Sequence, residues 1–538
     1  MASLQLLDLP PELIVSCLIH LPRADLVSCF KAQNHFLCRI ILDSILVQYR
    51  LEQDRASVEE NPVRMAGVAI SDRLADLRRR EEDWLAFNPR SRHTIKTSTS
   101  ASMDFYAPSI GSHDVGADIY ATAEGSHLTP QSSTVYTAIQ YMYTSPEVDS
   151  QRWHTLEFEK PFLVFFMALD EDDLIVIARL TPQGNNVSVL DMSVDVSLYK
   201  FPTGHLHPLA AQPILHIHTV QMQTGAGPVV SVDRAGDSLA VSILYQGDAH
   251  PDMDTLHVYD WKTGHPKMAP RKVNGAGLAF LTMDTLVVPN AVDASLDILR
   301  IPESSPRLLP ARLVHSLGLP ALAPGHEFLS CQCFARPNIR AGSPNASRAK
   351  FVPTLDNSLL LCWCWILLPE GGDRDTATYP FVIDRARLQH VLGSTPDGVR
   401  IPWAVWGPRC TRWFPATLPL PGMGAVYGAR LVLLAPCTVW RPSPLRILDF
   451  NPLHVGAARR RTHPPHVRVV EADDADDAID LPGFVEPLLS LLPYVETTSQ
   501  ERFVYPVVLI NNDNIIGYIR SDEEMGEEMD KLEVLHFG

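Results

Sequence analysis

One stretch near the start decides how this chain is organised, and it reads Leu9-Pro10-Pro11-Glu12-Leu13-Ile14. Prolines suit the first turn of a helix, where a missing N–H group costs nothing, and Glu12 complements the positive helix end. Leu21-Pro22 ends that helix, and apolar spacing predicts two more short helices before residue 46. Three short helices in about 40 residues cannot bury all their apolar side chains among themselves, so we expect a face that needs a partner.

This pattern resembles the F-box, the helical module that docks substrate receptors of ubiquitin ligases onto the Skp adaptor subunit. We place the module at residues 1–50, because the Leu-Pro-Pro-Glu-Leu start and the Leu-Pro break occur together at the usual spacing. The resemblance implies that the adaptor contacts Leu9, Pro10, Leu13, Ile14, Leu18, Leu21, Leu26 and Phe36. Residues 31–35 depart from the family, which more often has a Val-Ser-Lys/Arg type of sequence there. The alternative is an ordinary helical cap on a larger domain.

Two connecting segments follow the module. Residues 51–90 predict a helical linker, with Ser71-Asp72 as a helix start and Asn88-Pro89 as its end. A stiff helix here would hold the first module at a set distance from the rest of the chain. Residues 91–140 are rich in Ser, Thr and Gly, which indicates either an irregular connection or weak first strands.

Residues 141–520 repeat a strand-and-turn pattern that predicts a large all-β domain. An acid followed by apolar residues recurs at 173–176, 237–241 and 284–288, with weaker echoes near 359, 431 and 515. A Tyr-containing phrase at 198–205 returns at 258–265. Such repetition resembles a degenerate WD-type β-propeller, for which we expect six to eight blades. A pair of β-sandwiches or unrelated antiparallel sheets are the alternatives.

The predicted fold class is therefore α+β and multidomain, with small helical and large β parts. The strand near Val504 to Ile510 would close the ring against an early strand, since closure hides strand edges. Residues 521–538 hold seven acids and one lysine, which indicates an acidic C-terminal tail. Residues 473–480 predict an exposed acidic loop.

Composition excludes several function classes. The 538-residue chain carries a net charge of −17, which argues against a nucleic-acid binder. Its basic triplets, Arg78–Arg80 and Arg459–Arg461, are interpreted as solvated surface. Nine cysteines without a regular framework favour a reducing intracellular compartment, cytoplasm or nucleus. We see no signal peptide, and the apolar runs are too short for a membrane span.

Several clusters could carry chemistry, and each has a simpler interpretation. His205-Leu206-His207 and His216-Ile217-His218 could converge on a metal, but polar strand and turn positions are the favoured interpretation. Cys331-Gln332-Cys333 and Cys362-Trp363-Cys364 are typical of small core residues in apolar strands. The acids Asp170–Asp173 are interpreted as a solvated turn rather than catalytic carboxylates. We therefore predict no metal site and no cofactor.

An aromatic set in the second half of the chain could supply binding hot spots if it were exposed, or pack inside outer strands if it were not. Its members are Tyr379, Trp403, Trp406, Trp413, Phe414 and Trp440. The chain contains neither a Gly-x-Ser-x-Gly motif nor a phosphate-binding Gly-rich loop, which argues against an enzyme.

The interpretation that these observations favour is a substrate-recognition subunit of an SCF-type ubiquitin ligase. Its expected partners are the Skp adaptor, a cullin through that adaptor, and an unknown protein substrate, with neither nucleic acid nor membrane. A non-ligase interaction scaffold is the first alternative, and a propeller enzyme is a distant one.

Overall fold

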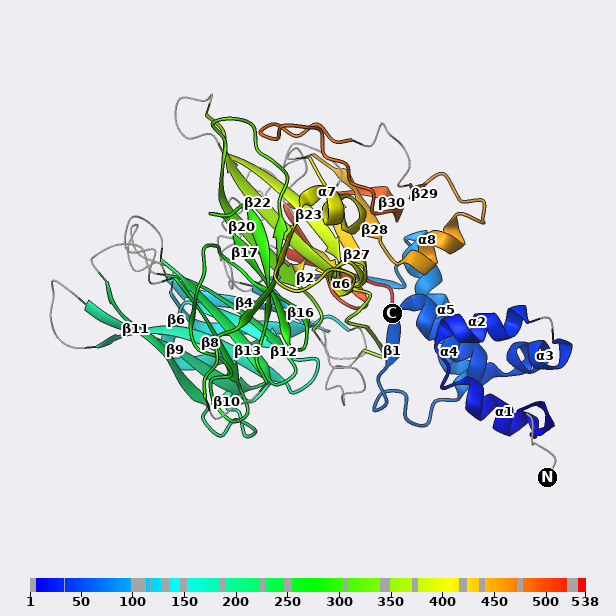
Figure 1. Ribbon diagram of the computed structural model, residues 1–538. Coiled ribbons are helices and arrows are strands. Elements are labelled where there is room, and N and C mark those ends of the chain that lie inside the picture. Colours follow the sequence, from blue (N-terminus) through cyan, green and yellow to red (C-terminus); the bar gives the residue numbers. More distant parts are fainter. Residues whose placement is uncertain are drawn as a thin grey trace.

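The computed structural model describes most of the chain. The described residues are 6–32, 34–97, 113–116, 118–126, 135–145, 152–183, 190–222, 228–245, 254–303, 307–338, 349–369, 376–415, 423–434, 441–471, 478–519 and 531–538. Helices gather at the N-terminal end, and the remainder is mostly β-sheet (Figure 1). No helix within these ranges is long and apolar enough to cross a membrane.

Five α-helices build the N-terminal part after a short 3-10 turn, η1 (Leu6–Asp8). They are α1 (Pro11–Leu18), α2 (Arg23–Lys31), α3 (His35–Asp43), α4 (Ile45–Ala56) and α5 (Ile70–Ala86). Pro11 opens α1 as predicted, and Pro22 precedes α2. Asn34 caps α3, because its side-chain oxygen accepts from the backbone N–H groups of Phe36 and Leu37, both at 3.1 Å. The expected start of α5 at Ser71 is wrong by one residue, since Ala69 is the N-cap.

Seven sheets follow, and each is called here by its first strand. The β3 sheet contains β3 (His113–Val115), β4 (Ile119–Ser126), β5 (Val135–Tyr143) and β6 (His154–Phe162). The β7 sheet contains β7 (Val164–Ala168), β8 (Leu174–Gln183), β9 (Leu190–Lys200), β10 (His205–Leu206) and β11 (Ile214–Met222). The β12 sheet contains β12 (Val229–Ala235), β13 (Ser238–Leu244), β14 (Thr255–Asp260) and β15 (Arg271–Lys272).

Three further sheets continue this order. The β16 sheet contains β16 (Ala279–Thr282), β17 (Thr285–Asn290), β18 (Ser295–Arg300), β19 (Arg312–Gly318) and β24 (Val399–Ile401). The β20 sheet contains β20 (Glu327–Ala335), β22 (Leu359–Leu367), β23 (Thr376–Asp384) and β25 (Thr411–Trp413). The β26 sheet contains β26 (Val426–Tyr427), β27 (Arg430–Leu434), β28 (Ser443–Asp449), β29 (Val467–Val470) and β30 (Tyr494–Phe503).

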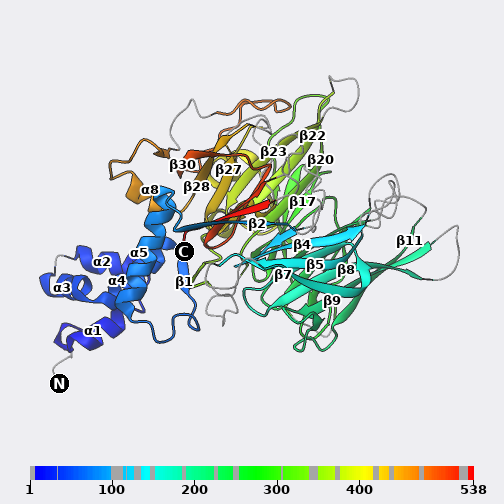
Figure 2. The ribbon, with the colours of Figure 1, turned by 180° about the vertical axis from the view of Figure 1, so that it is seen from behind.

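The seventh sheet joins the two ends of the β-rich region, and we call it the closing sheet. It contains β31 (Val507–Ile510), β32 (Asn514–Ile519), β33 (Lys531–His536) and, from far earlier in the chain, β2 (Ser91–Lys96). Figure 2 shows β2 beside the C-terminal strands, with Ser91 opposite His536 and Lys96 opposite Lys531.

The closing sheet corrects two expectations. The acidic-tail prediction is wrong for residues 531–538, because β33 is an inner strand with Leu532 and Val534 buried; residues 521–530 lie outside the described ranges. The predicted closing strand, Val504 to Ile510, contains β31, but β31 is an edge strand and the long-range pairing is made by β33. The acidic run in front of β33 masked its apolar alternation in the sequence.

The repeated sequence phrase marks one position in the sheets. Its six copies lie at the starts of β8, β13, β17, β22, β27 and β32, each the second strand of its sheet. The seventh second strand, β4, follows Asp118, so a copy of the phrase lay unrecognised in the Ser/Thr/Gly-rich region. The described residues between 91 and 140 therefore contain β2, β3, β4 and the start of β5.

The first strands of the sheets meet around a common cavity of about 70 Å³. Residues of β31, β3, β7, β12, β20 and β26 line it, together with Leu278 immediately before β16. Six of the seven sheets therefore contribute to the lining, and Leu278 lies beside the seventh. Most of the apolar core lies between neighbouring sheets, in clusters such as the one that joins β16, β20 and β25.

Candidate functional site

The helical module has a core of its own. The side chains that fill it are Ile14, Leu18, Leu26, Leu37, Ile40, Ile41 and Val47. Ile14, Leu18 and Leu26 were expected on the adaptor surface, but each is at most 1% exposed. The expectation missed that α4 packs against α1 as a fourth wall, which covers the stripe. In this structure these three residues stabilise the module.

The other expected contact residues lie nearer the surface. Leu13 is 51% exposed and Phe36 45%, Pro10 is exposed, and Leu9 and Leu21 are half-buried. Sequence reasoning missed five further exposed apolar side chains, which are Leu6, Leu7, Phe30, Leu42 and Ile45. Together with Leu13 and Phe36 we call these seven side chains the module apolar surface.

This surface is unusual for the molecule. Of 21 large apolar side chains that are exposed in the described ranges, seven belong to residues 6–45. The sequence of α3 could have predicted this exposed surface. Its apolar face is so wide that Phe36, Ile40 and Leu42 cannot all point to one core. Exposed apolar side chains gathered on one small module mark a site for protein contact.

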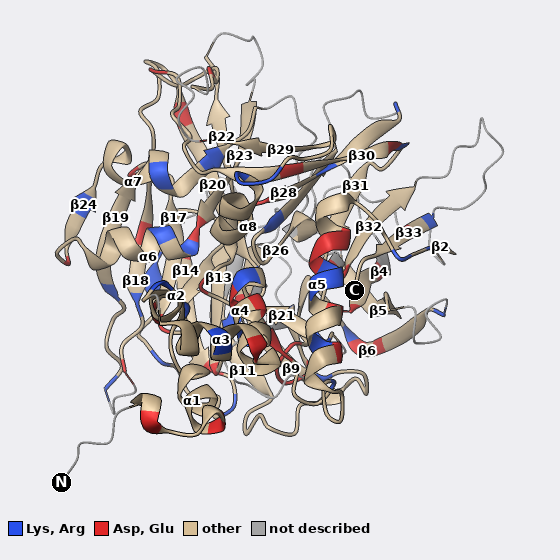
Figure 3. Ribbon diagram, turned by 90° about the vertical axis from the view of Figure 1, so that its right-hand side faces the viewer, with Lys and Arg blue, Asp and Glu red and all other residues tan. Residues whose placement is uncertain are grey.

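Helix α5 joins the module to the β-rich body. The ring of Trp84 stacks on Phe537 at 4.1 Å between centroids, and the guanidinium of Arg430 lies 4.9 Å from the Trp84 centroid. Before α5, β1 (Val58–Glu60) pairs with β21 (Phe351–Pro353). Arg73 then donates to both carboxylate oxygens of Glu60 at 3.0 Å. Figure 3 looks onto the module, with charged residues along α5 in front of the strands.

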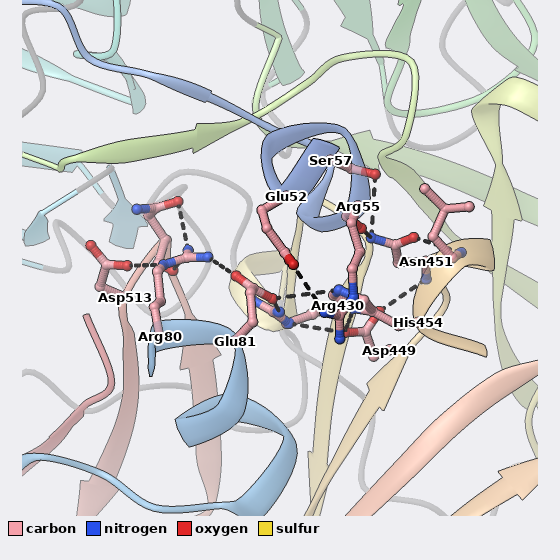
Figure 4. Close-up of polar contacts among 12 residues, drawn as sticks. Glu52, Arg55, Ser57, Arg80, Glu81, Arg430, Asp449, Asn451, His454 and Asp513 are labelled. Carbon is pink, nitrogen blue, oxygen red and sulfur yellow. Dashed lines mark hydrogen bonds and ion pairs between the residues drawn. The ribbon is translucent and has the colours of Figure 1, made fainter. Parts of the chain in front are cut away.

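A buried ion network sits at the centre of this joint (Figure 4). Arg80, whose side chain is only 4% exposed, donates to Asp513 at 2.7 Å and to the backbone carbonyl of Asn512 at 2.6 Å. Glu81 accepts from Arg80 and from Arg430 of β27. The joint therefore connects α5 with both the closing sheet and the β26 sheet. The interpretation of Arg78–Arg80 as solvated surface is wrong for Arg80.

The network continues through the β26 sheet. Arg430 pairs with Asp449 at 3.3 Å, and Nδ1 of His454 lies 2.9 Å from the same carboxylate. Burial alone would raise the pKa values of Glu81 and Asp449, but the neighbouring cations outweigh it. Arg430 and Arg80 hold the pKa of Glu81 below its usual value, and His454 and Arg430 hold that of Asp449 well below its own.

The aromatic set belongs to the core rather than to a binding face. Trp406 and Trp413 are fully buried, Tyr379 and Phe414 are nearly so, and Trp403 is half-buried. Trp413 stacks on Phe381 at 4.1 Å. Trp440 lies outside the described residues.

The histidine and cysteine pairs do not form a metal centre. His207 is buried with Nε2 at 2.9 Å from the carbonyl oxygen of Asp172, whereas His216 contacts Asp195 on a neighbouring strand. The cysteines form two facing pairs across β20 and β22, with Sγ–Sγ distances of 3.3 Å for Cys331–Cys364 and 3.0 Å for Cys333–Cys362. Among the described residues, no group of three or more His, Cys, Asp or Glu side chains could hold a metal ion.

The acids at 170–173 were expected to form a solvated turn, but three of them are ion-paired. Glu171 pairs with the buried Arg234 at 2.9 Å, Asp172 also contacts Arg234, and Asp173 pairs with Lys200 at 2.7 Å. This turn is an ion-paired rim beside the central cavity rather than a solvated loop. For the acidic loop expected at 473–480, residues 473–477 lie outside the described ranges.

Comparisons with known proteins leave the family open. No family model and no curated protein matches the chain. A provisionally named 6-phosphogluconolactonase from Bacteroides fragilis has 11% identity and a TM-score of 0.30, over 63% of this chain and 79% of that one. A Bacteroides uniformis protein of the same provisional name has 10% identity and a TM-score of 0.30, over 71% and 100%. Pyrococcus horikoshii acylaminoacyl peptidase has 9% identity and a TM-score of 0.29, over 67% and 55%. Such TM-scores establish neither a shared fold nor a shared activity.

Proposed function

We propose that this chain is the substrate-recognition subunit of an SCF-type ubiquitin ligase. The helical module would act as the F-box, and the seven sheets as the blades of a β-propeller that holds the substrate. The observation that carries the proposal is the module apolar surface, which lies on helices with the Leu-Pro-Pro-Glu-Leu start. In the β-rich body the large apolar side chains are mostly interior.

Three features support the propeller. Most strands of each sheet follow one another along the chain, although β24 returns to the β16 sheet. First strands of six sheets line one cavity, and β2, at the start of the β-rich region, pairs with β33 at its end. Radial repetition with such a closing pair leaves few free strand edges, which is the physical advantage of a propeller.

Burial of the module apolar surface would contribute favourable free energy to docking. Fully burying one Leu or Phe side chain is worth roughly 1.5–3 kcal/mol relative to leaving it exposed. Leu13 and Phe36 are half-exposed, so each would contribute about half of that on docking, and five further side chains could add to it. The module therefore offers enough apolar contact for a stable complex once α1–α3 meet a partner.

The joint at α5 gives the proposed receptor its mechanism. A receptor accelerates ubiquitin transfer by holding its target near the charged conjugating enzyme, so the distance between module and substrate domain must be defined. The buried network around Arg80 and Glu81 supplies that rigidity. The eight described cysteines are all free thiols, which fits a reducing compartment such as cytoplasm or nucleus.

Binding to the Skp adaptor tests the proposal. The full-length chain is titrated with purified adaptor by calorimetry, and compared with a Leu13→Asp/Phe36→Ala double variant. We expect the variant to bind at least about 100-fold more weakly, because two contact side chains are lost and a charge is introduced. Leu206→Asp/Leu209→Ala is the matched control, since Leu206 and Leu209 are 45% and 54% exposed on the β-rich body. It should bind like the wild type.

Two results would count against the proposal. A folded wild-type chain that does not bind the adaptor would remove the F-box role. Equal adaptor binding by the double variant and the wild type would show that the module apolar surface is not the contact. Addition of a cullin to the adaptor complex then separates a ligase receptor, which recruits it, from an interaction scaffold, which does not.

A further inference from the structure

The central cavity contains polar groups that the proposed function does not use. Five residues contribute charged or hydroxyl groups to its lining: Asp114, Ser231, Asp233, Arg336 and Tyr427. A second cavity of about 30 Å³ adjoins it and shares Asp233 and Arg336. The volume of the larger cavity corresponds to several water molecules or one small organic molecule, because a single water needs roughly 10–15 Å³ on this measure.

Three buried polar atoms around the two cavities have no hydrogen-bond partner among the described residues. They are Oγ of Ser231, the phenol oxygen of Tyr427 and Oδ1 of Asp170, which lines the smaller cavity. Ser231 and Tyr427 are each only 4% exposed. Buried polar atoms are nearly always satisfied in folded proteins, so three in one place indicate a missing polar ligand.

The charges around the cavity do not balance. The guanidinium of Arg336 pairs with Asp114 at 2.7 Å, and the carboxylates of Asp170 and Asp233 also face it. Glu171 and Arg234 also line the smaller cavity, so four carboxylates line the two cavities against two guanidinium groups. Arg385 gives partial relief, since it donates to Asn338 at 2.6 Å, and Asn338 donates to Asp233 at 2.9 Å. The cluster still has more negative than positive charge.

Two acids around the cavities have raised pKa values, and burial is the main cause for both. Burial raises the pKa of Asp170 to about 7, although Arg336 opposes the change. The other charged groups that act on Asp170 are Asp118, Glu171 and Arg234, and the two acids among them raise its pKa further. Asp170 is therefore partly protonated near neutral pH, and a bound cation would compete with that proton.

Asp233 behaves in the same way. Burial raises the pKa of Asp233 to about 6. The backbone N–H groups of Phe280 and Arg234 oppose that increase, as do the side-chain charges of Arg385 and Arg336. These donors and cations do not fully compensate for burial, which leaves a second carboxylate able to favour a bound cation.

We propose that the cavity binds a small organic ammonium ion. The N–H groups of an ammonium would donate to carboxylate oxygens such as Oδ1 of Asp170. A hydroxyl on the same molecule would meet the unpartnered hydroxyls of Ser231 and Tyr427. A metal ion fits less well, because the described residues provide no group of three ligands arranged to hold one. This site is independent of adaptor binding.

Three matched probes test the charge of the ligand. Full-length protein is titrated near neutral pH with ethanolamine, ethylene glycol or glycolate, which share a hydroxyl and differ in the charge of the second group. Ligand-observed NMR at concentrations up to about 50 mM suits the weak affinity of so small a ligand. Saturable binding of ethanolamine, at least about tenfold tighter than either other probe, would support the proposal. Equal binding of all three, tighter binding of glycolate, or no saturable ethanolamine binding would overturn it.

Matched variants then locate the site. Asp170→Asn should weaken ethanolamine binding about tenfold or more, and Tyr427→Phe should weaken it several-fold. Asp173→Asn is the control, because Asp173 pairs with Lys200 and does not line either cavity. Its affinity should equal that of the wild type. In both Asp→Asn variants the Asn side chain keeps the shape of Asp. If Asp173→Asn weakens ethanolamine binding as much as Asp170→Asn does, the proposed location of the site is wrong.

The pH dependence of ethanolamine affinity tests whether Asp170 and Asp233 contact the ligand, because a purely structural role of these acids would not produce it. Ethanolamine should displace protons from Asp170 and Asp233, so its affinity should rise about tenfold between roughly pH 5.5 and pH 7.5. The rise should disappear in an Asp170→Asn/Asp233→Asn double variant. A lysine-containing tripeptide that binds while ethanolamine does not would assign the ammonium to a protein partner and overturn the small-molecule site.

Discussion

The helical module and the β-rich body use apolar side chains in opposite ways. The module buries seven of them in a small core and leaves seven others exposed between residues 6 and 45. The body buries large aromatic side chains such as Trp261, Trp406 and Trp413. A module of this length has too little interior for all its apolar surface, whereas the sheets of the body bury theirs between neighbouring sheets. This difference is the basis of the proposal that the module docks onto a partner.

The joint between the two regions follows a third pattern. Charged side chains from α5, β27 and the closing sheet are buried together around Arg80 and Glu81. Buried charges are tolerated when each has a partner in good geometry, so this network favours the orientation in which Arg80 meets Asp513 and Glu81.

The largest expected effect comes from breaking this joint. Arg80→Ala should lower the free energy of unfolding by roughly 3–5 kcal/mol, because Asp513 would remain buried without its cation and Glu81 would keep only Arg430. Urea denaturation monitored by circular dichroism measures the loss. Arg78→Ala is the control, since the Arg78 side chain is 43% exposed and should matter by less than about 0.5 kcal/mol. Equal losses in the two variants would mean that the buried network does not hold α5.

Ile14 and Leu13 are neighbours on α1, but Ile14 is buried and Leu13 is exposed. Substituting each one therefore tests the core and the surface of the module separately. Ile14→Ala should destabilise the module by roughly 2–4 kcal/mol, because Ile14 is fully buried and the substitution leaves a cavity. Leu13→Ala should change its stability by less than about 0.5 kcal/mol and act on adaptor binding alone. Hydrogen exchange of the α1–α4 amides reads the stability of the module separately from the body. A larger loss for Leu13→Ala would place the core on the other face.

The third test concerns the body. Asp170 has a pKa of about 7 in the folded chain against an ordinary value of 3.8, so folding favours its protonated form. The stability from this proton is fully present below pH 3.8 and is lost as pH rises through about 7. Asp170→Asn should therefore be more stable than the wild type by roughly 1–3 kcal/mol at alkaline pH, with little difference in acid.

Thermal unfolding across this pH range, repeated with Asp173→Asn, checks the source of that effect. Asp173→Asn serves as the control because Asp173 is ion-paired with Lys200 at 2.7 Å, and its substitution should be neutral or slightly destabilising. A parallel alkaline gain in the control would mean that the general acidity of the turn, and not the buried Asp170, carries the effect.

The smallest effect is expected at the start of α3. Asn34→Ala should cost about 1 kcal/mol, because two backbone N–H groups lose their acceptor. Asn34→Ser should restore most of the loss, and the exposed neighbour His35→Ala should change little. Hydrogen exchange of the module amides measures the stability of all three variants. No difference between Asn34→Ala and His35→Ala would show that the cap does not contribute.

Local features were well predicted from the sequence, and long-range pairings were not. Pro11 and Pro22 located two helix starts, and the acid-plus-apolar phrase located six second strands. The Asp118 copy was missed because its surroundings are rich in Ser, Thr and Gly. Within the candidate site, Leu13 and Phe36 are exposed, as adaptor contact requires, whereas Ile14, Leu18 and Leu26 are buried in the module core. Their burial depends on packing between α1, α2, α3 and α4, which the sequence pattern does not specify.

The sequence by itself determined the helices, the strands and the division between a small helical part and a large β part. These depend on proline positions, turn residues and apolar period, all of which act over a few residues. Only the tertiary structure decided that β33 pairs with β2, that Arg80 meets Asp513 433 residues away, and that six first strands line one cavity. Such contacts carry no local signal, because they are selected by how all the sheets pack together.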